Sequence, residues 1–179
     1  MHRISLCLLS ILLPFQLLAG KFDPVKDLIS RRVPWLKNHV IFKSLKSTSQ
    51  EMFELKTQND KVLISASGPN AAAVGLNWYL KEYCHRSMSH MGDNLDPVWP
   101  LPKVNEKVQV TAAAQYRYAL NYCTYNYTMS FYNWNDWERE LDWMALNGVN
   151  MMLAVAGMEA VWQNNLLQIG YKQKEIQDF

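Results

Sequence analysis

Cysteine is scarce in this sequence of 179 residues, which contains three. Cys7 lies in the apolar N-terminal stretch, so a processed chain would keep only Cys84 and Cys123. Two cysteines make no disulfide framework, which excludes a small disulfide-stapled domain; they could pair or remain independent thiols. Charge of one sign is also lacking, because the formal net charge is +2 and no basic run occurs. Nothing therefore indicates a nucleic-acid partner.

Motifs for phosphate loops, dinucleotide turns, HExxH zinc sites and Ser-His-Asp hydrolases are absent. We therefore expect no cofactor and no metal. One cluster of soft ligands, Cys84-His85-Arg86-Ser87-Met88-Ser89-His90-Met91, could hold Cu(I) in an exported protein. It lacks zinc-finger spacing and reads equally well as a helix end followed by a loop. Soft-metal binding is kept as a minor alternative.

A long hydrophobic run is missing too. The apolar stretch Ile4–Leu13 is too short to span a membrane, so no membrane span is predicted. It follows the basic start His2-Arg3 and precedes the small-residue site Leu17-Leu18-Ala19-Gly20. This pattern is typical of a secretory signal peptide, here residues 1–20, with cleavage after Ala19 or Gly20. We expect export to a periplasmic, extracellular or lysosomal-type compartment.

What the sequence does contain is a globular composition, 49% hydrophobic and 12% aromatic, with seven Trp and nine Tyr. The aromatic side chains are concentrated after Trp99. Such a bias favours a carbohydrate or another flat ligand, although packing accounts for most aromatic residues.

Residues 21–112 have the mixed periodicity of a small α/β domain. Two alternating strands flank the hairpin turn Asn59-Asp60, and a later strand covers Val108–Val110. One helix is expected between Phe22 and Trp35, and another opens at residues 67–70 and continues to Tyr83. The expected strands are Met52–Leu55 and Val62–Ser65; the expected buried helical positions are Val25, Leu28 and Ile29 in the first helix and Ala71, Val74, Trp78 and Tyr79 in the second.

Residues 113–179 follow a strand-helix-strand-helix order, for which right-handed parallel crossovers are the default. The predicted strands are Tyr116–Asn121 and Val149–Val155, the second apolar enough to be covered on both faces. The helix between them is predicted at residues 136–147, and a second at Met158–Ile169 ends at Gly170. Asn135 and Glu138 are predicted to cap the first helix, Gly148 to end it, and Trp137, Leu141, Met144 and Ala145 to form its buried face.

The segment NYCTYNYTMSFYNWNDWERELDWMALNGVN, followed by AVAGMEAVWQ, resembles the start of the catalytic domain of glycoside hydrolase family 89, the alpha-N-acetylglucosaminidases. The likeness is close from Tyr118 to Phe179 and looser before it. It implies a (β/α)8 TIM barrel that removes terminal alpha-linked N-acetylglucosamine with retention, using two glutamates and no metal. Such a barrel needs about 250 residues. We therefore expect a truncated chain that holds two barrel units, lacks both catalytic glutamates and is inactive alone.

The predicted substrate-binding residues lie where the two barrel strands end. Asn121 and Cys123 follow the first strand, and the resemblance implies that both line the sugar pocket; a buried amide and an inert thiol are the alternative. Tyr127 matches a family tyrosine but could equally serve packing. Gly157 and Glu159 follow the second strand, where a structural role for Glu159 at its helix start outweighs a catalytic one.

The acidic residues of the first barrel helix are a weaker site candidate. Glu138 and Asp142 share a face, but barrel active sites lie beyond the strand ends and not along an outer helix. Capping and ion pairing with Arg139 are therefore the predicted roles of Asp136, Glu138, Glu140 and Asp142. Two functions remain open: the N-terminal part of an exported exo-glycosidase acting on a glycan, or a non-catalytic secreted sugar-binding module.

Overall fold

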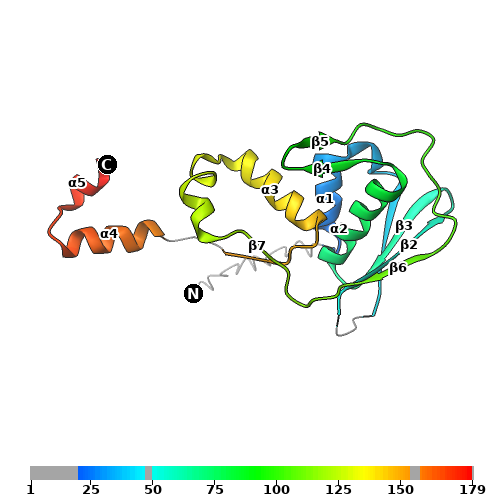
Figure 1. Cartoon of the computed structure of the whole chain (residues 1–179), viewed down its shortest axis with the longest axis horizontal. Helices are drawn as coiled ribbons and strands as arrows, with labels where there is room; N and C mark the ends of the chain where they lie inside the picture. The colour runs from blue at the N-terminus through cyan, green and yellow to red at the C-terminus, as the bar shows by residue number, and fades with distance from the viewer. Residues whose placement is uncertain (1–19, 47–49, 154–157, 179) are drawn as a thin grey trace, which may run out of the picture.

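The computed structural model describes residues 20–46, 50–153 and 158–178. The predicted signal peptide and Gly157 lie outside the described residues. Figure 1 shows a sheet-and-helix body, from which β7 and α3 extend toward α4 and α5. None of the described helices combines the length and the apolar character that crossing a bilayer requires.

The body contains a four-stranded sheet in the order β1-β3-β2-β6. Strands β2 and β3 form the predicted antiparallel hairpin, and both turn residues, Asn59 and Asp60, have positive φ angles of 51° and 55°. That conformation is the one a two-residue hairpin turn requires. β1 pairs parallel with β3, and β6 pairs antiparallel with β2. The strands are β1 (Val40–Ser44), β2 (Met52–Gln58), β3 (Lys61–Ala66) and β6 (Val108–Thr111).

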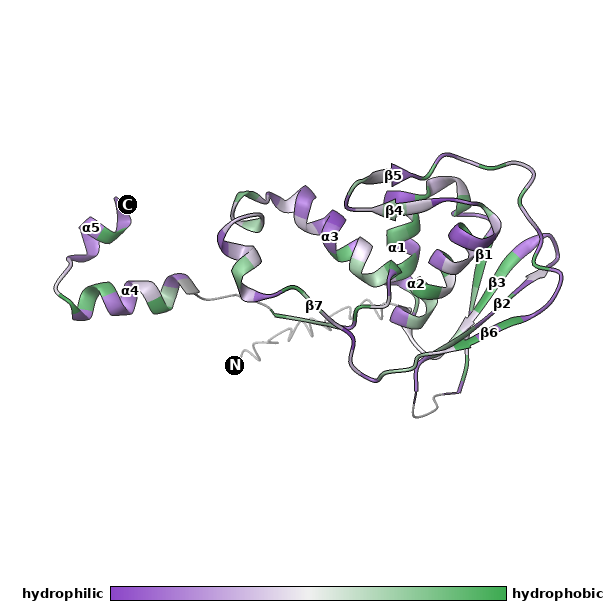
Figure 2. Ribbon diagram, viewed as in Figure 1, coloured by the Kyte–Doolittle hydropathy of each residue, from purple (hydrophilic) through white to green (hydrophobic). Residues whose placement is uncertain are grey.

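Two helices, α1 (Asp23–Arg32) and α2 (Pro69–Trp78), complete the core of this body. α2 contacts β2, β3 and α1, and Figure 2 shows hydrophobic colouring where α1 and α2 meet. The approach of α2 to the sheet is close: a Cβ atom on Gly75 would lie 2.9 Å from Ile64 Cγ2. Glycine is therefore required there by packing. Val25, Leu28 and Ile29 are buried as predicted.

Several short elements join these parts. A 3-10 turn, η1 (Pro34–Leu36), follows α1, and a π-helical turn, η2 (Tyr79–Tyr83), continues α2. The small hairpin of β4 (Ser87–Ser89) and β5 (Gly92–Asn94) follows η2. A long connector from β5 to β6 then contains the cis peptide bond between Trp99 and Pro100.

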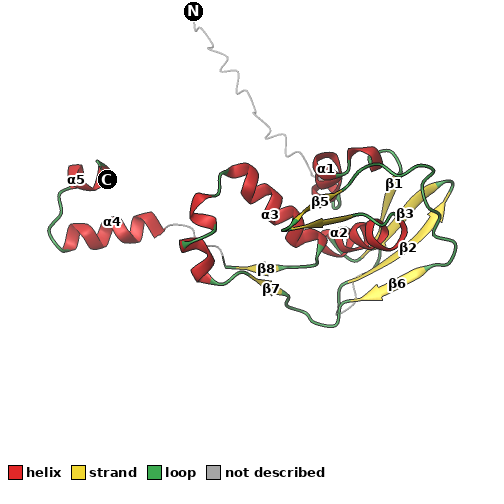
Figure 3. Ribbon diagram, turned by 45° about the horizontal axis from the view of Figure 1, so that its top comes forward, coloured by secondary structure: helices red, strands yellow, loops and turns green. Residues whose placement is uncertain are grey.

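The second region begins with β7 (Tyr118–Ala119), which pairs parallel with β8 (Met151–Met152). Figure 3 shows the two strands side by side. Between them lie two 3-10 helices, η3 (Tyr122–Asn126) and η4 (Met129–Phe131), and the helix α3 (Trp134–Leu146). Gly148 ends α3 with a φ of 78°, as predicted. α4 (Met158–Gln168) and α5 (Gln173–Gln177) follow, and Gly170 between them has a φ of 105°.

The two regions share one hydrophobic core. α3 packs against α2, and Leu146 belongs to the same buried cluster as the residues of α1, α2 and the sheet. The buried Asn77 amide donates to the Leu146 carbonyl over 2.8 Å. Burial of an amide requires such a partner, so this bond fixes where α3 ends relative to α2.

Four local predictions were wrong. Asn133, not Asn135, caps α3, and its capping partner is Asp136, not Glu138. Of the predicted buried face of α3, Met144 is buried, but Trp137 and Ala145 are half-buried and Leu141 is 40% exposed. The other buried residues of α3 are Glu140, Asp142 and Leu146. Trp78 is 36% exposed and packs on Phe53 at the core margin. Among the described residues, the strands expected at Tyr116–Asn121 and Val149–Val155 form a ladder of two residues each, and Met151 and Leu153 are exposed. Ala154 and Val155 of the second predicted strand lie outside the described residues.

Candidate functional site

The ends of β7 and β8 lie at one edge of their sheet because the two strands are parallel. Asn121 is the second residue after β7, and η3 and η4 form the loop that follows. Several large aromatic side chains of β7 and of the segment from its end to the first residue of α3 are exposed: Tyr118, Tyr122, Tyr127, Phe131 and Trp134. The strand-end loop therefore presents aromatic rings and polar side chains together, which is the surface composition that carbohydrate binding uses.

Asn121 has a defined local role. Its Oδ1 atom accepts hydrogen bonds from Thr124 N at 3.1 Å and Thr124 Oγ1 at 3.3 Å, and it thereby caps η3. Tyr127 joins the same turn, because its hydroxyl lies 3.4 Å from Thr124 Oγ1. The structure thus brings two predicted residues together through Thr124, which sequence analysis missed. Asn is a favoured N-cap residue whose side chain accepts from the backbone two or three residues later, and this is the signal that could have found the turn.

The remaining predicted residues are less closely grouped. Cys123 lies in η3 between Asn121 and Tyr127; its thiol is exposed and unpaired, while Cys84 is buried. The two cysteines are thus separate. Glu159 lies exposed in the first turn of α4, and within the described residues it has no hydrogen bond to the η3 turn. Gly157 falls outside the described residues.

An aromatic stack anchors the strand-end loop. Tyr125 lies parallel to Trp137 with ring centroids 5.7 Å apart, and Tyr132 meets Trp137 edge-on at 5.5 Å. The Tyr125 hydroxyl donates to the Leu153 carbonyl, which ties the β7 loop to the end of β8. Burial raises the pKa of Tyr125 and of Tyr132, so both remain neutral donors at ordinary pH. Trp137 therefore fixes the loop and does not form a buried helix face.

The carboxylates of α3 have structural roles, as predicted. Asp136 accepts from Asn133 N at 3.0 Å in the capping box. Asp142 accepts from both Arg31 and Arg32 of α1 at 2.7 Å, and Glu138 lies 3.7 Å from each of these arginines. The hydrogen bond to Asp142 raises the pKa of Arg31. The prediction that these carboxylates pair with Arg139 was wrong.

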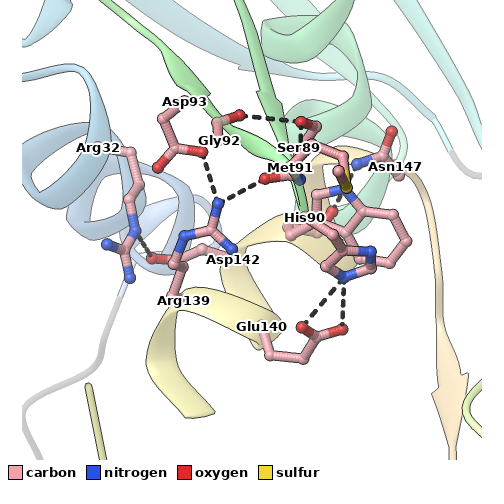
Figure 4. Close-up of polar contacts among 11 residues, drawn as sticks. Arg32, Ser89, His90, Met91, Gly92, Asp93, Arg139, Glu140, Asp142 and Asn147 are labelled. Carbon is pink, nitrogen blue, oxygen red and sulfur yellow. Dashed lines mark hydrogen bonds and ion pairs between the residues drawn. The ribbon is translucent and has the colours of Figure 1, made fainter. Parts of the chain in front are cut away.

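Arg139 and Glu140 instead bind the β4–β5 hairpin (Figure 4). Arg139 donates to Asp93 Oδ1 at 2.7 Å and to the Ser89 carbonyl at 2.6 Å. Both oxygens of Glu140 lie 3.1 Å from His90 Nε2, and the His90 ring lies 4.1 Å from the Trp143 ring. We call Arg31, Arg32, His90, Asp93, Glu138, Arg139, Glu140 and Asp142 the domain clamp. It joins α3 to the N-terminal region and leaves its carboxylates unavailable for catalysis.

The soft-ligand cluster is dispersed. Cys84 and Met88 lie in the hydrophobic core, His90 is engaged by Glu140, and Met91 is 97% exposed. Burial raises the pKa of the Cys84 thiol, which disfavours the thiolate that a metal would need. Within residues 20–46, 50–153 and 158–178, no three His, Cys, Asp or Glu side chains are placed to hold a metal ion.

A small sheet-and-helix domain leads into parallel strand-helix units, and the first of these has an aromatic strand-end loop. This is the architecture of an N-terminal α/β domain followed by the start of a TIM barrel. Residues 23–103 match the alpha-N-acetylglucosaminidase (NAGLU) N-terminal domain, and residues 117–179 match the NAGLU tim-barrel domain. Together the two matches cover most of the chain. The chain belongs to the alpha-N-acetylglucosaminidase family.

Individual relatives agree with this assignment. Human alpha-N-acetylglucosaminidase is 41% identical over 119 residues, which are 66% of this chain and 16% of the human protein. A Clostridium perfringens family 89 glycoside hydrolase in complex with 2-acetamido-1,2-dideoxynojirmycin is 38% identical with a TM-score of 0.79 over 89% of this chain. The same values apply to the C. perfringens protein in complex with its substrate, GlcNAc-alpha-1,4-galactose. The chain spans 18% of that bacterial protein.

Proposed function

We propose that this chain is the N-terminal part of an exported, retaining exo-glycosidase that removes terminal alpha-linked N-acetylglucosamine from glycans. In this proposal the two catalytic glutamates lie beyond residues 1–179. The observation that carries it is the match of residues 117–179 to the family's tim-barrel domain, which includes the strand-end loop at Asn121. The substrate complex of the C. perfringens relative supports the choice of sugar.

The chain's own contribution is sugar binding at the barrel edge. Asn121 uses Oδ1 to cap η3, so its Nδ2 group is left to donate to a sugar hydroxyl. We assign substrate contacts to Asn121, Cys123, Tyr127, Gly157 and Glu159. A retaining mechanism requires two carboxyl groups roughly 5 Å apart, one as nucleophile and one as acid and base. The domain clamp cannot supply them, because Asp142 is buried and paired with Arg31 and Arg32, and Glu140 is buried against the His90 ring.

Hydrolysis tests the assignment directly. We expect the 179-residue chain to release no phenol from an aryl alpha-N-acetylglucosaminide, while the same chain extended through the rest of its barrel hydrolyses it. The first product observed by NMR should keep the alpha configuration. Turnover by the 179-residue chain that disappears in Glu159→Gln would contradict both the missing glutamates and the role given to Glu159.

Asn121→Ala tests the binding loop in the extended protein. Loss of one hydrogen bond to the substrate should lower kcat/KM by about tenfold. Asn126→Ala is the matched control, because Asn126 is an exposed amide in the same short helix. Equal losses in the two variants would contradict a specific substrate contact by the Asn121 amide.

Export is proposed from the basic start, the apolar run and the small residues near Ala19. Expression in a secreting host, followed by mass spectrometry of the N-terminal peptide, tests it. We expect a mature protein that begins at Gly20 or Lys21. Recovery of the unprocessed chain in the cytoplasm alone would exclude a signal peptide.

A further inference from the structure

The connector between β5 and β6 carries an aromatic side chain that the barrel-edge site does not use. The Trp99 indole is 55% exposed, although two rings hold it in place. His39 meets it edge-on with centroids 5.0 Å apart, and Trp35 does so at 6.2 Å. Contacts of this kind restrict the orientation of a ring, and more than half of the indole surface stays exposed. Trp99 therefore presents a preformed flat surface.

A hollow of about 290 Å³ lies beside this indole. Its apolar walls include Pro100, Leu101 and Pro102, and its polar lining consists of His39, Thr57, Asp60, Lys61 and Lys103. The size is close to the lower bound of small-ligand sites, about 300 Å³. The hollow thus combines one aromatic face with both hydrogen-bond donors and hydrogen-bond acceptors.

The walls of the hollow are fixed by hydrogen bonds to β2 and to η2. Val104 N donates to Thr57 Oγ1 at 2.8 Å, and Thr57 N donates to the Val104 carbonyl at 3.1 Å. The buried Tyr79 hydroxyl donates to the Pro102 carbonyl at 2.9 Å. A site that is ordered before binding loses less conformational entropy when a ligand arrives.

Polar groups remain available at the rim. Lys103 pairs with Asp60 at 2.9 Å, but both side chains are exposed, so the pair can exchange for ligand hydroxyls. In the described part of the chain, neither the Lys61 ammonium nor Trp99 Nε1 has a hydrogen-bond partner. Both are donors that a sugar hydroxyl could accept.

We propose that this hollow is a second carbohydrate-binding site, in which a pyranose ring stacks on Trp99 and its hydroxyls bond Asp60, Lys61 and Lys103. The connector passes around the end of the sheet that lies away from β7 (Figure 1). The site is thus separate from the barrel edge. It binds a glycan and requires no hydrolysis itself.

The experiment is an NMR titration of the whole chain with GlcNAc-alpha-1,4-galactose, methyl N-acetylglucosaminide and methyl galactoside as probes. We expect saturable shifts of the Trp99 indole N–H at millimolar sugar, assigned with Trp99→Phe. Trp99→Ala should weaken this binding about tenfold, or about 1.4 kcal/mol. Tyr171→Ala, which removes an aromatic ring of similar exposure, should leave it unchanged.

Lys61→Ala provides a second measurement if Trp99→Ala does not fold. It keeps the indole and removes one rim donor, and it should weaken binding about threefold. The absence of a saturable shift with all three sugars would overturn the proposal, as would unchanged affinity in Lys61→Ala and in a folded Trp99→Ala. Because the measurement is binding at Trp99, its outcome does not depend on the proposed glycosidase activity. Asn121→Ala should leave the Trp99 shifts intact.

Discussion

At the scale of single residues, the domain clamp depends on Asp142. Its carboxylate is 5% exposed and accepts from two guanidinium groups. Removal of one charge from a buried ion pair leaves the other uncompensated. Asp142→Asn should therefore lower the free energy of unfolding by about 2–4 kcal/mol. This is less than the loss of a fully buried ion pair usually costs, because Arg31 is partly exposed. Urea unfolding measures it, and Glu106→Gln, an exposed carboxylate, should change it little.

The buried Cys84 and Tyr79 predict a loss of stability in alkali. Burial raises the pKa of both groups, and the unfolded chain ionises at the ordinary values. A raised pKa means that folding favours the neutral form. The contribution of each neutral group to the free energy of unfolding is therefore complete below its unfolded pKa and is lost as the pH rises above that value. The urea midpoint should fall as the pH rises above about 8.5, where the unfolded Cys ionises, and fall further above about 10, where the unfolded Tyr ionises. Cys84→Ala should make that fall smaller; an identical fall in the variant would remove Cys84 as a cause.

At the scale of elements, α3 offers a matched pair of variants. Asn133 Oδ1 accepts from Asn135 N at 2.8 Å and from Asp136 N at 3.3 Å. Asn133→Ala should destabilise the chain by about 1 kcal/mol, the usual value of an N-cap. Asn135→Ala should have almost no effect, because the Asn135 side chain is exposed and only its backbone takes part. Thermal unfolding of the two variants distinguishes the caps; the reverse order would contradict the structure.

Periodicity predicted α1, the β2–β3 hairpin and the end of α3 well, because each depends on neighbouring residues. The strand β1 was missed because Ile41 is exposed although it is apolar. The burial of the strand alternates, but the run Val40-Ile41-Phe42 shows no alternation of apolar and polar residues in the sequence. The buried face of α3 was also misjudged. Glu140 and Asp142 are buried only because His90, Arg31 and Arg32, distant in sequence, lie opposite them. Ion pairs between residues distant in sequence leave no local pattern, so the domain clamp could not be predicted. The contact between Asn121 and Thr124 is local and could have been predicted.

At the scale of the whole molecule, the hydrophobic core of the N-terminal region is incomplete without α3. Leu146 is 1% exposed within the shared core, and the buried Asn77 amide bonds its carbonyl. A chain cut after Ala112 would expose this core surface and leave Asn77 without its partner. We expect such a chain to have a lower Tm than one cut after Asn150. A shorter chain that melts at the same temperature would show that the α/β domain is independent.

Arg117 links the N-terminal region to the residues before both barrel strands. It donates to Asn70 Oδ1 at 2.9 Å and to the carbonyls of Ala114 and Gly148, and it pairs with Glu51. A single side chain thus links the start of α2, the beginning of β2, the residues before β7 and those before β8. Since synthesis on the ribosome runs from the N-terminus and N-terminal domains fold first, Glu51 and Asn70 are in place before β8 emerges. Once α3 has completed the shared core, the N-terminal region is a template that sets the direction of β8 while the ribosome is still adding residues.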